Sequence, residues 1–256
     1  MSEVQLFHCL PIPAGSKDNV FELQALRMVL LHNIIIRGFN SLIYYSGEVE
    51  PNTPKYNAFL AYVGETISYL HHHHGNEEEK YFPFLESKMG KGSMSGNVDG
   101  HESFKAPFAA FENLYAKLRS GEAQWDLAAF RKAIYDFIPV LREHLEEEID
   151  TFRPWQLKDK FTAEELLTFE AEMDKHVMSQ VSLVKDPQYM FINADGAPHG
   201  SWFPPIPPPV AFVARQVLWH IHSSWWQFGC CDKYMKVKPQ FAPYEPVMEN
   251  KEAPAS

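Results

Sequence analysis

Residues 55–88 read KYNAFLAYVGETISYLHHHHGNEEEKYFPFLESK and combine apolar residues at helical spacing with four histidines and three consecutive glutamates. At about 100° of rotation per residue, a stripe of apolar side chains lies within about 40° of His74. Glu78, four residues after His74, falls on that stripe. Its other members are Val63, Ile67, Leu70, Tyr81 and Leu85. The pattern predicts a long helix that points one histidine and one glutamate into a core.

The other three histidines of the run, residues 71–73, are expected at the surface or behind the inward-facing side chains. His73 and Glu77 share a more polar stripe of the same helix, together with Tyr62, Thr66, Tyr69, Lys80 and Phe84. Acidic runs such as residues 77–79 and 146–148 are usually solvated. We therefore expect only Glu78 of the first run and Glu148 of the second to point inward.

Residues 125–152 repeat the arrangement in a second predicted helix. His144 and Glu148 are four residues apart, and side chains at that spacing project side by side from one helix face. Pro139 is expected to bend this helix. The stripe around His144 also holds Phe130, Ala133, Phe137, Val140, Thr151 and Trp155.

Two more histidines lie on apolar stripes, in helices predicted over residues 20–46 and 101–119. Each of them alone could be a hydrogen-bonded core residue, which is the commoner role of a single buried histidine. His32 shares its stripe with Phe21, Ala25, Met28, Ile36, Phe39 and Ile43, and His101 shares its stripe with Phe108, Glu112 and Tyr115.

These four amphipathic patterns predict an all-α fold, an up-down-up-down four-helix bundle over residues 20–155 with a glycine-rich loop near residues 90–100. Residues 156–256 are expected to form a C-terminal extension that packs on or beside the bundle. In it, a capping box at Thr162 and Glu165 opens a helix, and an aromatic, proline-rich segment at 198–209 precedes another helix at 210–228. The last twenty residues, with four prolines, are expected to be poorly ordered.

Buried glutamates are costly unless they are paired or bound to a cation. Two inward-facing Glu-His pairs, with one further His from each remaining helix, would form a set of carboxylate and imidazole ligands. This set suits iron or manganese, and also zinc or copper on affinity grounds. Four His and two bridging Glu could hold two ions. The candidate ligands are His32, His74, Glu78, His101, His144 and Glu148.

Charge and cysteine content limit the class of protein. The 256 residues carry 23 Lys plus Arg against 33 Asp plus Glu, a formal charge of −10, which disfavours nucleic-acid binding. Three cysteines, Cys9, Cys230 and Cys231, argue against a disulfide framework and for a reducing compartment. The N-terminus has no signal-peptide pattern, and no apolar stretch is long enough to predict a membrane span. We expect a soluble, cytoplasmic protein.

At these residues the chain resembles the hemerythrin-like family, whose members carry an HHE cation-binding domain. The resemblance covers about residues 20–155: His32, then His74-x-x-x-Glu78 with Tyr81-Phe82-Pro83, then His101, then His144-x-x-x-Glu148 with Phe152-x-Pro154. The remainder is similar to the extension of fungal members. The resemblance implies two non-haem iron ions, bridged by both glutamates and an oxo or hydroxo group, with the six candidate ligands around them. Manganese and zinc stay open.

The chain departs from the oxygen-carrying hemerythrins at one position. Those proteins have a second histidine one turn after the third-helix ligand, where this chain has Lys105. The absence of a fifth histidine weakens the implication of reversible oxygen carriage. Lys105, Tyr81 and Glu112 are candidates for residues that lie beside the ligands or line a pocket.

Three functions remain open from the sequence. The first is a binding protein for dioxygen, another small diatomic ligand, or iron itself. The second is an oxygen-dependent di-iron oxidase or oxygenase that acts on a small apolar organic substrate under the extension. The third is a structural bundle, metal-free or zinc-filled, whose extension binds a partner. The extension could also simply cover bundle surface.

Overall fold

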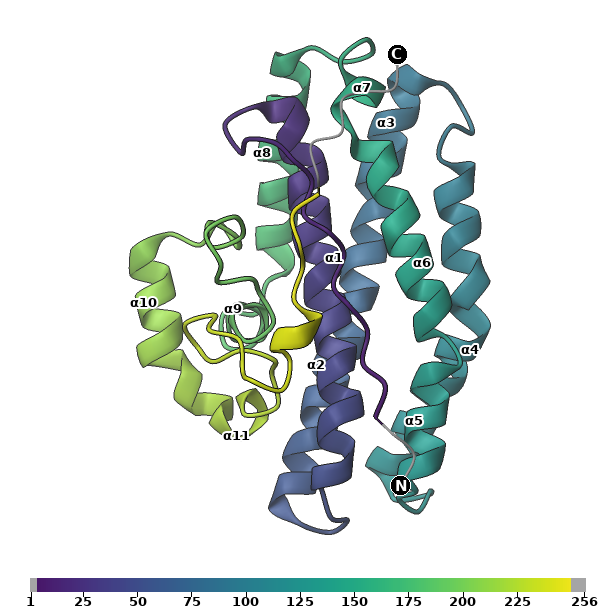
Figure 1. The fold of residues 1–256 in the computed structure, drawn as a ribbon, viewed down its shortest axis with the longest axis vertical. Coiled ribbons are helices and arrows are strands. Elements are labelled where there is room, and N and C mark those ends of the chain that lie inside the picture. The colour runs from purple at the N-terminus through teal and green to yellow at the C-terminus, as the bar shows by residue number, and fades with distance from the viewer. Residues whose placement is uncertain (1–3, 250–256) are drawn as a thin grey trace.

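The computed structural model describes residues 4–249 and confirms the all-α class (Figure 1). Four antiparallel helical columns form the bundle. Among the described residues, β structure is limited to isolated bridges. The first column is α1 (Val20–Tyr45), followed by the 3-10 turn η1 (Ser46–Glu48). The second is α2 (Pro54–Asn76), the π-helical segment η2 (Glu77–Tyr81) and α3 (Phe82–Met89). The third is α4 (Ser95–Ser120), and the fourth is α5 (Leu127–Tyr135), α6 (Ile138–Glu148) and η3 (Ile149–Phe152).

Two helix boundaries differ from the expectations. The fourth column is broken between α5 and α6 rather than bent, because Pro139 lies in the first turn of α6. Proline suits a first turn, where its missing N–H is not needed, and would clash inside a continuous helix. The third column begins at Ser95, so half of the expected glycine-rich loop is helical.

Aromatic side chains fill the bundle core around Phe39 of α1. The Phe39 ring lies 5.2 Å from that of Phe137 and 6.4 Å from that of Phe111, measured between centroids. Phe59 contacts Phe130 and, from the extension, Phe228. Residues 20–48 are long and apolar enough to cross a membrane, but 89% of their apolar 18-residue stretch is buried inside the fold. This is the environment of a core helix.

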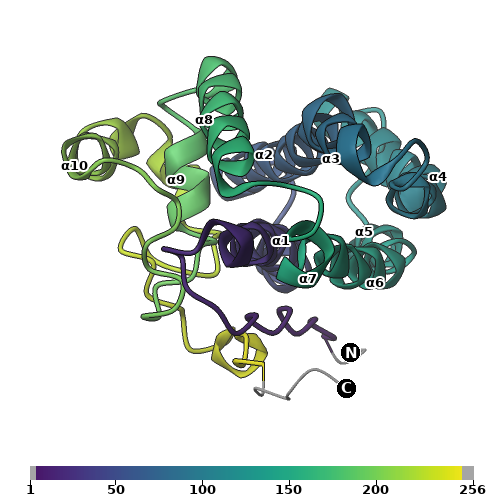
Figure 2. The same ribbon diagram turned by 90° about the horizontal axis from the view of Figure 1, so that it is seen from above.

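The residues after 155 cover the side of the bundle formed by α1 and α2, as the view from above shows (Figure 2). After α7 (Pro154–Leu157), α8 (Ala163–Gln180) packs against α1. The expected capping box is confirmed: Thr162 Oγ1 accepts from the Glu165 N–H at 3.2 Å, and Glu165 Oε2 accepts from the Thr162 N–H at 2.9 Å. The short helix α9 (Asp186–Phe191) follows.

The prediction of a single helix over residues 210–228 is wrong. The segment forms three pieces, α10 (Pro208–Gln216), η4 (Leu218–His222) and α11 (Ser223–Trp226). Ala214 and Trp226 would lie about 120° apart around one continuous helix. The break allows both side chains to be buried, with α11 packed against α2.

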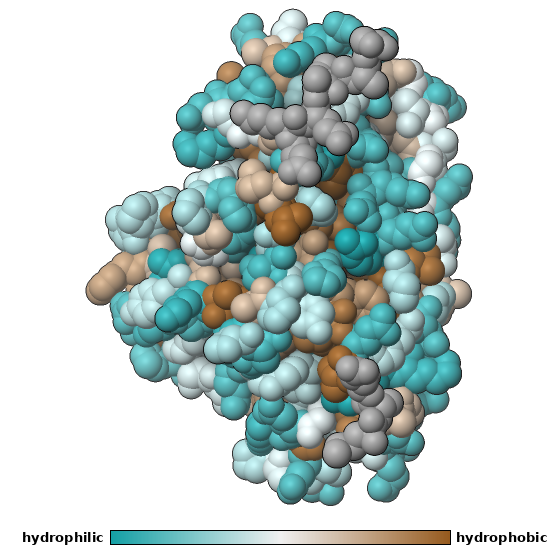
Figure 3. Space-filling view, viewed as in Figure 1, coloured by the Kyte–Doolittle hydropathy of each residue, from teal (hydrophilic) through white to brown (hydrophobic). Residues whose placement is uncertain are grey.

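The two terminal segments lie side by side along α1 (Figure 1). The Cys9 N–H donates to the Tyr244 carbonyl at 2.9 Å, and Ile12 pairs with Met248 in a parallel bridge. The front face is largely hydrophilic, and apolar side chains show mainly along this seam (Figure 3). The expected disorder of the last twenty residues is therefore wrong up to Glu249, while Pro254 lies outside the described residues.

A buried ion pair fastens the C-terminal segment to α1. Arg37 is 1% exposed, and its Nε and Nη2 donate to the two carboxylate oxygens of Glu245 at 2.9 and 2.6 Å. Its Nη1 donates to the Asn193 carbonyl at 3.2 Å. The guanidinium thus has partners from two different parts of the extension.

Glu245→Ala should destabilise the fold by about 3 kcal/mol, because the buried guanidinium loses two hydrogen bonds and keeps only Asp195, 3.8 Å from its Nη2, as a nearby carboxylate. Urea unfolding measures the change. The matched control is Glu48→Ala, whose exposed pair with Lys55 spans 3.3 Å and should contribute well under about 1 kcal/mol. Equal losses in the two variants would contradict a structural role for the Arg37 pair.

Candidate metal centre

Seven polar side chains gather in the interior of the bundle, in two adjacent groups. In each group, one potential ligand atom per residue lies within 4.8 Å of the corresponding atoms of the others. All are buried except His74, which is partly exposed as a residue but has a buried Nε2 atom. The first group is His32 of α1, His73 of α2, Glu77 of η2 and Glu148 of α6; the second is His74 of α2, His101 of α4 and His144 of α6.

Five of the six side chains singled out from the sequence lie in this cluster. The sixth, Glu78, does not: its side chain is 54% exposed, so the expectation that it points inward is wrong. Glu77 is buried in its place, and His73 is buried beside His74. The stripe assigned as more polar is also covered, since Tyr62 and Thr66 are buried.

Helix geometry explains the exchange of Glu78 for Glu77. α2 has two neighbours in the bundle, and side chains adjacent in sequence point about 100° apart. The His73 ring faces α1, with its centroid 4.9 Å from that of His32, and the His74 ring faces α4, 4.2 Å from His101. With His73 at zero, Glu77 falls at about 40°, between the two histidines, and Glu78 at about 140°, outside them.

Hydrogen bonds orient two of the imidazoles. His32 Nδ1–H donates to the Leu145 carbonyl at 2.7 Å, and His101 Nδ1–H donates to Glu78 Oε1 at 2.7 Å. Each bond places the proton on Nδ1 and leaves the lone pair of Nε2 facing the cluster. Such support is typical of metal-binding histidines. Glu78 therefore acts on the cluster from outside, through His101.

Glycine at position 100 allows α4 to approach α6. A Cβ built on Gly100 would overlap Nδ1 of His144. The absence of a side chain lets the His144 ring lie against the α4 backbone. This close approach explains a glycine within a helix, where it otherwise lowers stability.

Nine buried atoms of the cluster have no hydrogen-bond partner: Nε2 of each of the five histidines and both carboxylate oxygens of each of the two glutamates. Some are close, but without hydrogen-bond geometry. His73 Nε2 lies 3.0 Å from Glu77 Oε1, and His101 Nε2 lies 3.5 Å from Glu77 Oε2. Glu77 thus presents one oxygen to each group. Buried polar atoms are rarely left unpaired, so this set fits a site for cations.

The electrostatics agree with that interpretation. Burial and neighbouring histidines lower the pKa of His144 to about 3 and hold the pKa of His74 well below its usual value. Burial and the Glu77 charge raise the pKa of Glu148 well above its usual value. Burial also opposes ionisation of Glu77, but His73 and His101 outweigh it and lower its pKa. Burial opposes protonation of His101, but Glu77 and Glu78 outweigh it and raise its pKa. The neutral imidazoles of His74 and His144 beside two crowded carboxyl groups suit metal ligation.

The residues expected beside the ligands are placed differently. The Lys105 side chain is 69% exposed and paired with Glu102, and Glu112 pairs with His71 at 2.6 Å near the surface. Neither joins the cluster. Tyr81 is partly buried, with its hydroxyl bonded to Gln24 and to Glu170 of α8.

Comparison with known proteins agrees with the geometry. Residues 27–155 match the model of the hemerythrin HHE cation binding domain. The chain is 26% identical over 234 residues to the dimeric xanthone biosynthesis cluster protein R11 of Cryptosporiopsis sp. (strain 8999). The matched region covers 87% of this chain and 83% of that protein. No solved structure matches. With a match over half of its length and a buried His-Glu cluster within the matched helices, the chain belongs to the hemerythrin HHE cation-binding family.

Proposed function

We propose that the cluster binds two non-haem iron ions and that the protein uses them to bind dioxygen or another small diatomic ligand. The observation that carries the proposal is the set of nine unpaired buried atoms, all of them potential metal ligands. His32 and His73 would hold one ion and His74, His101 and His144 the other. Glu77 and Glu148 would be shared. Manganese and zinc accept the same ligand types.

The fifth histidine missing from α4 has a substitute in this arrangement. His74 lies in the group with His101 and His144, where Lys105 does not reach. The group of His32 and His73 has one imidazole fewer than the other. An external ligand would therefore find its coordination position at that ion. Iron there would supply the electrons for binding dioxygen.

An oxidase that acts on a small organic substrate is the second candidate. The name of the Cryptosporiopsis relative refers to a biosynthesis cluster, and the extension, through Glu170, reaches Tyr81 one turn beyond Glu77. For either function we propose a cytoplasmic location, because Cys9, Cys230 and Cys231 are all unpaired thiols that suit a reducing compartment.

An optical spectrum of iron-loaded protein, reduced without air and then exposed to oxygen, tests the proposal. We expect a visible band that disappears when oxygen is removed. A transient band that decays irreversibly to a ferric spectrum would favour the oxidase. Two bound ions with no spectral response to oxygen or nitric oxide would contradict both.

Glu77→Gln should abolish binding of at least one ion, since it removes a charged ligand shared by both groups. Glu78→Gln should weaken binding by about ten- to a hundredfold, because Glu78 only orients His101. Glu79→Gln, at an exposed position paired with Lys80, is the matched control and should bind normally. Metal content after chelator competition provides the readout. A larger loss in Glu78→Gln than in Glu77→Gln would reverse our assignment.

His74→Ala should reduce the content from two ions to one, because it removes an imidazole from the second group. Lys105→His should leave the content at two and the spectrum unchanged, because position 105 faces solvent. Metal analysis and the spectrum of the oxidised protein check both variants. A normal content in His74→Ala would show that His74 is not a ligand.

A further inference from the structure

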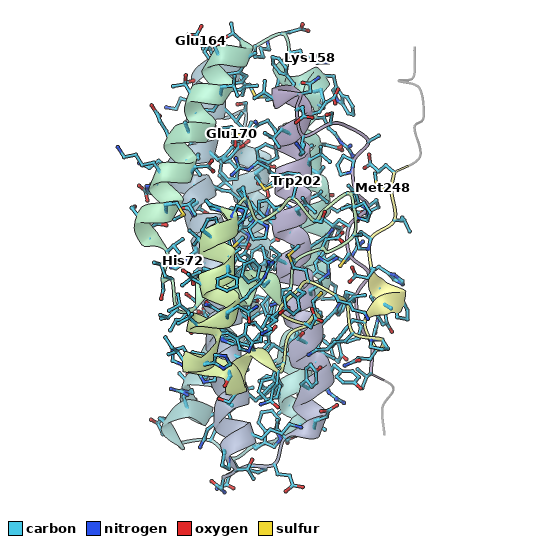
Figure 4. All side chains as sticks on the ribbon, turned by 90° about the vertical axis from the view of Figure 1, so that its left-hand side faces the viewer. His72, Lys158, Glu164, Glu170, Trp202 and Met248 are labelled. Atoms are coloured by element: carbon cyan, nitrogen blue, oxygen red, sulfur yellow. The ribbon has the colours of Figure 1, made fainter. Side chains whose placement is uncertain are left out.

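A cleft of about 430 Å³ lies between the bundle and the extension, within the size range of small-molecule sites. Its walls come from α2 and α4 on one side, and from residues 180–186 and α11 on the other. Figure 4 shows His72, one of the lining residues, on the outer side of the bundle, near the end of α8. Nothing in the proposed metal centre uses this cleft.

The cleft is separate from the His-Glu cluster, although both involve α2. His72 points about 100° away from His73, and Ser68 about 140° away in the same direction. The cluster faces the opposite side of the helix. A ligand in the cleft would therefore contact the outer face of α2 and would not coordinate a bound metal.

The charged side chains of the extension wall already have partners. Lys185 Nζ pairs across the cleft with Glu65 of α2 at 2.8 Å, and Asp186 Oδ2 accepts from the Ser182 N–H at 2.7 Å. Lys185 and Asp186 therefore already have partners within the protein. A charged ligand would gain little from the extension wall.

The bundle wall, in contrast, holds four side chains whose N–H or O–H groups have no partner among the described residues. Ser68 and His72 of α2 and Tyr115 and Arg119 of α4 line the cleft. Their side chains make no hydrogen bond or ion pair with any residue between 4 and 249. A Cβ at Gly64 would overlap the Tyr115 hydroxyl, so the glycine leaves room for that group against α2. The wall thus offers these donors and the exposed guanidinium of Arg119, while its one carboxylate, Glu65, is paired with Lys185.

Trp225 of α11 supplies an aromatic surface opposite these donors. One of its faces is stacked on His222, with centroids 3.9 Å apart and an interplanar angle of 16°. Lys185 Nζ lies over the ring, 5.6 Å from the indole centroid, so the edge of the indole is the part left open to a ligand. Aromatic walls favour flat apolar groups, and guanidinium groups bind carboxylates through paired hydrogen bonds.

From these features we propose that the cleft binds a small aromatic carboxylate. Its ring would lie against Trp225 and its acid group would accept hydrogen bonds from Arg119 and the neighbouring donors of the bundle wall. The ligand would join α2 to α11. The inference does not depend on the proposed metal chemistry, so the two can fail separately.

Ligand-observed fluorine NMR with 4-fluorobenzoate and the full-length protein, with and without bound metal, tests this inference. We expect saturable binding in both forms. Arg119→Gln should raise the dissociation constant at least about tenfold, the loss expected for one charge-assisted contact. Trp225→Leu should raise it by a similar factor, because it removes the aromatic contact to the ring. Fluorobenzene, which lacks the carboxylate, should bind more weakly than 4-fluorobenzoate.

Two control variants account for changes of charge and aromatic content. Lys117→Gln removes a positive charge from α4 two residues from Arg119, at an exposed position outside the cleft. Trp155→Leu removes an exposed tryptophan of α7. Both should bind the probe like the wild type. Absence of saturation below about 10 mM, or equal affinity in Arg119→Gln and Lys117→Gln, would overturn the proposal, and thermal melting confirms that each variant is folded.

Discussion

The structure depends on the burial of two carboxylates, Glu77 and Glu148, in an apolar bundle. Neither makes a hydrogen bond to the protein, and the five nitrogen atoms that face them are likewise unpaired. A dry interior does not hold two adjacent carboxylates as negative charges without compensation. His73 and His101 favour the charge on Glu77, whereas burial and that same charge disfavour ionisation of Glu148. The surrounding residues preserve this arrangement rather than relieve it: the Leu145 carbonyl and Glu78 hold two rings in place, and Gly100 gives His144 its space.

Sequence patterns identify the bundle and most of the cluster, because an apolar stripe shows which face of a helix is buried. His101, His144 and Glu148 lie on helices that present a single face to the centre, and His32 lies within α1, which is buried on nearly all sides. The second column could not be read in the same way. α2 packs against α1 on one side and α4 on the other, so its buried sector is wider than one stripe and is centred between His73 and His74. The polar character of Tyr62 and Thr66 concealed this, because the residues that cover them lie more than a hundred positions later in the chain. The break within residues 210–228 was hidden for the same reason.

The extension determines how the bundle is buried. Asn193 accepts from the Tyr62 hydroxyl at 3.1 Å, and the same residue's carbonyl binds Arg37, so one short segment contacts both α1 and α2. The terminal segments then close over α1. Together these contacts make α1 and α2 interior helices, whereas α4 and α5 keep long exposed faces. The bundle and the extension therefore form one continuous core.

The adjacency of His73 and His74 has a geometric consequence. Each group of the cluster takes one imidazole from α2, and consecutive Cα atoms of a trans peptide are about 3.8 Å apart. The spacing between the two groups on this helix is thus set by covalent geometry, which is nearly constant. Distances that depend on contacts between helices vary more. When the helices of the bundle fluctuate relative to one another, the two halves of the centre are displaced together. The peptide unit between His73 and His74 therefore keeps the α2 backbone positions of the two groups at a fixed separation.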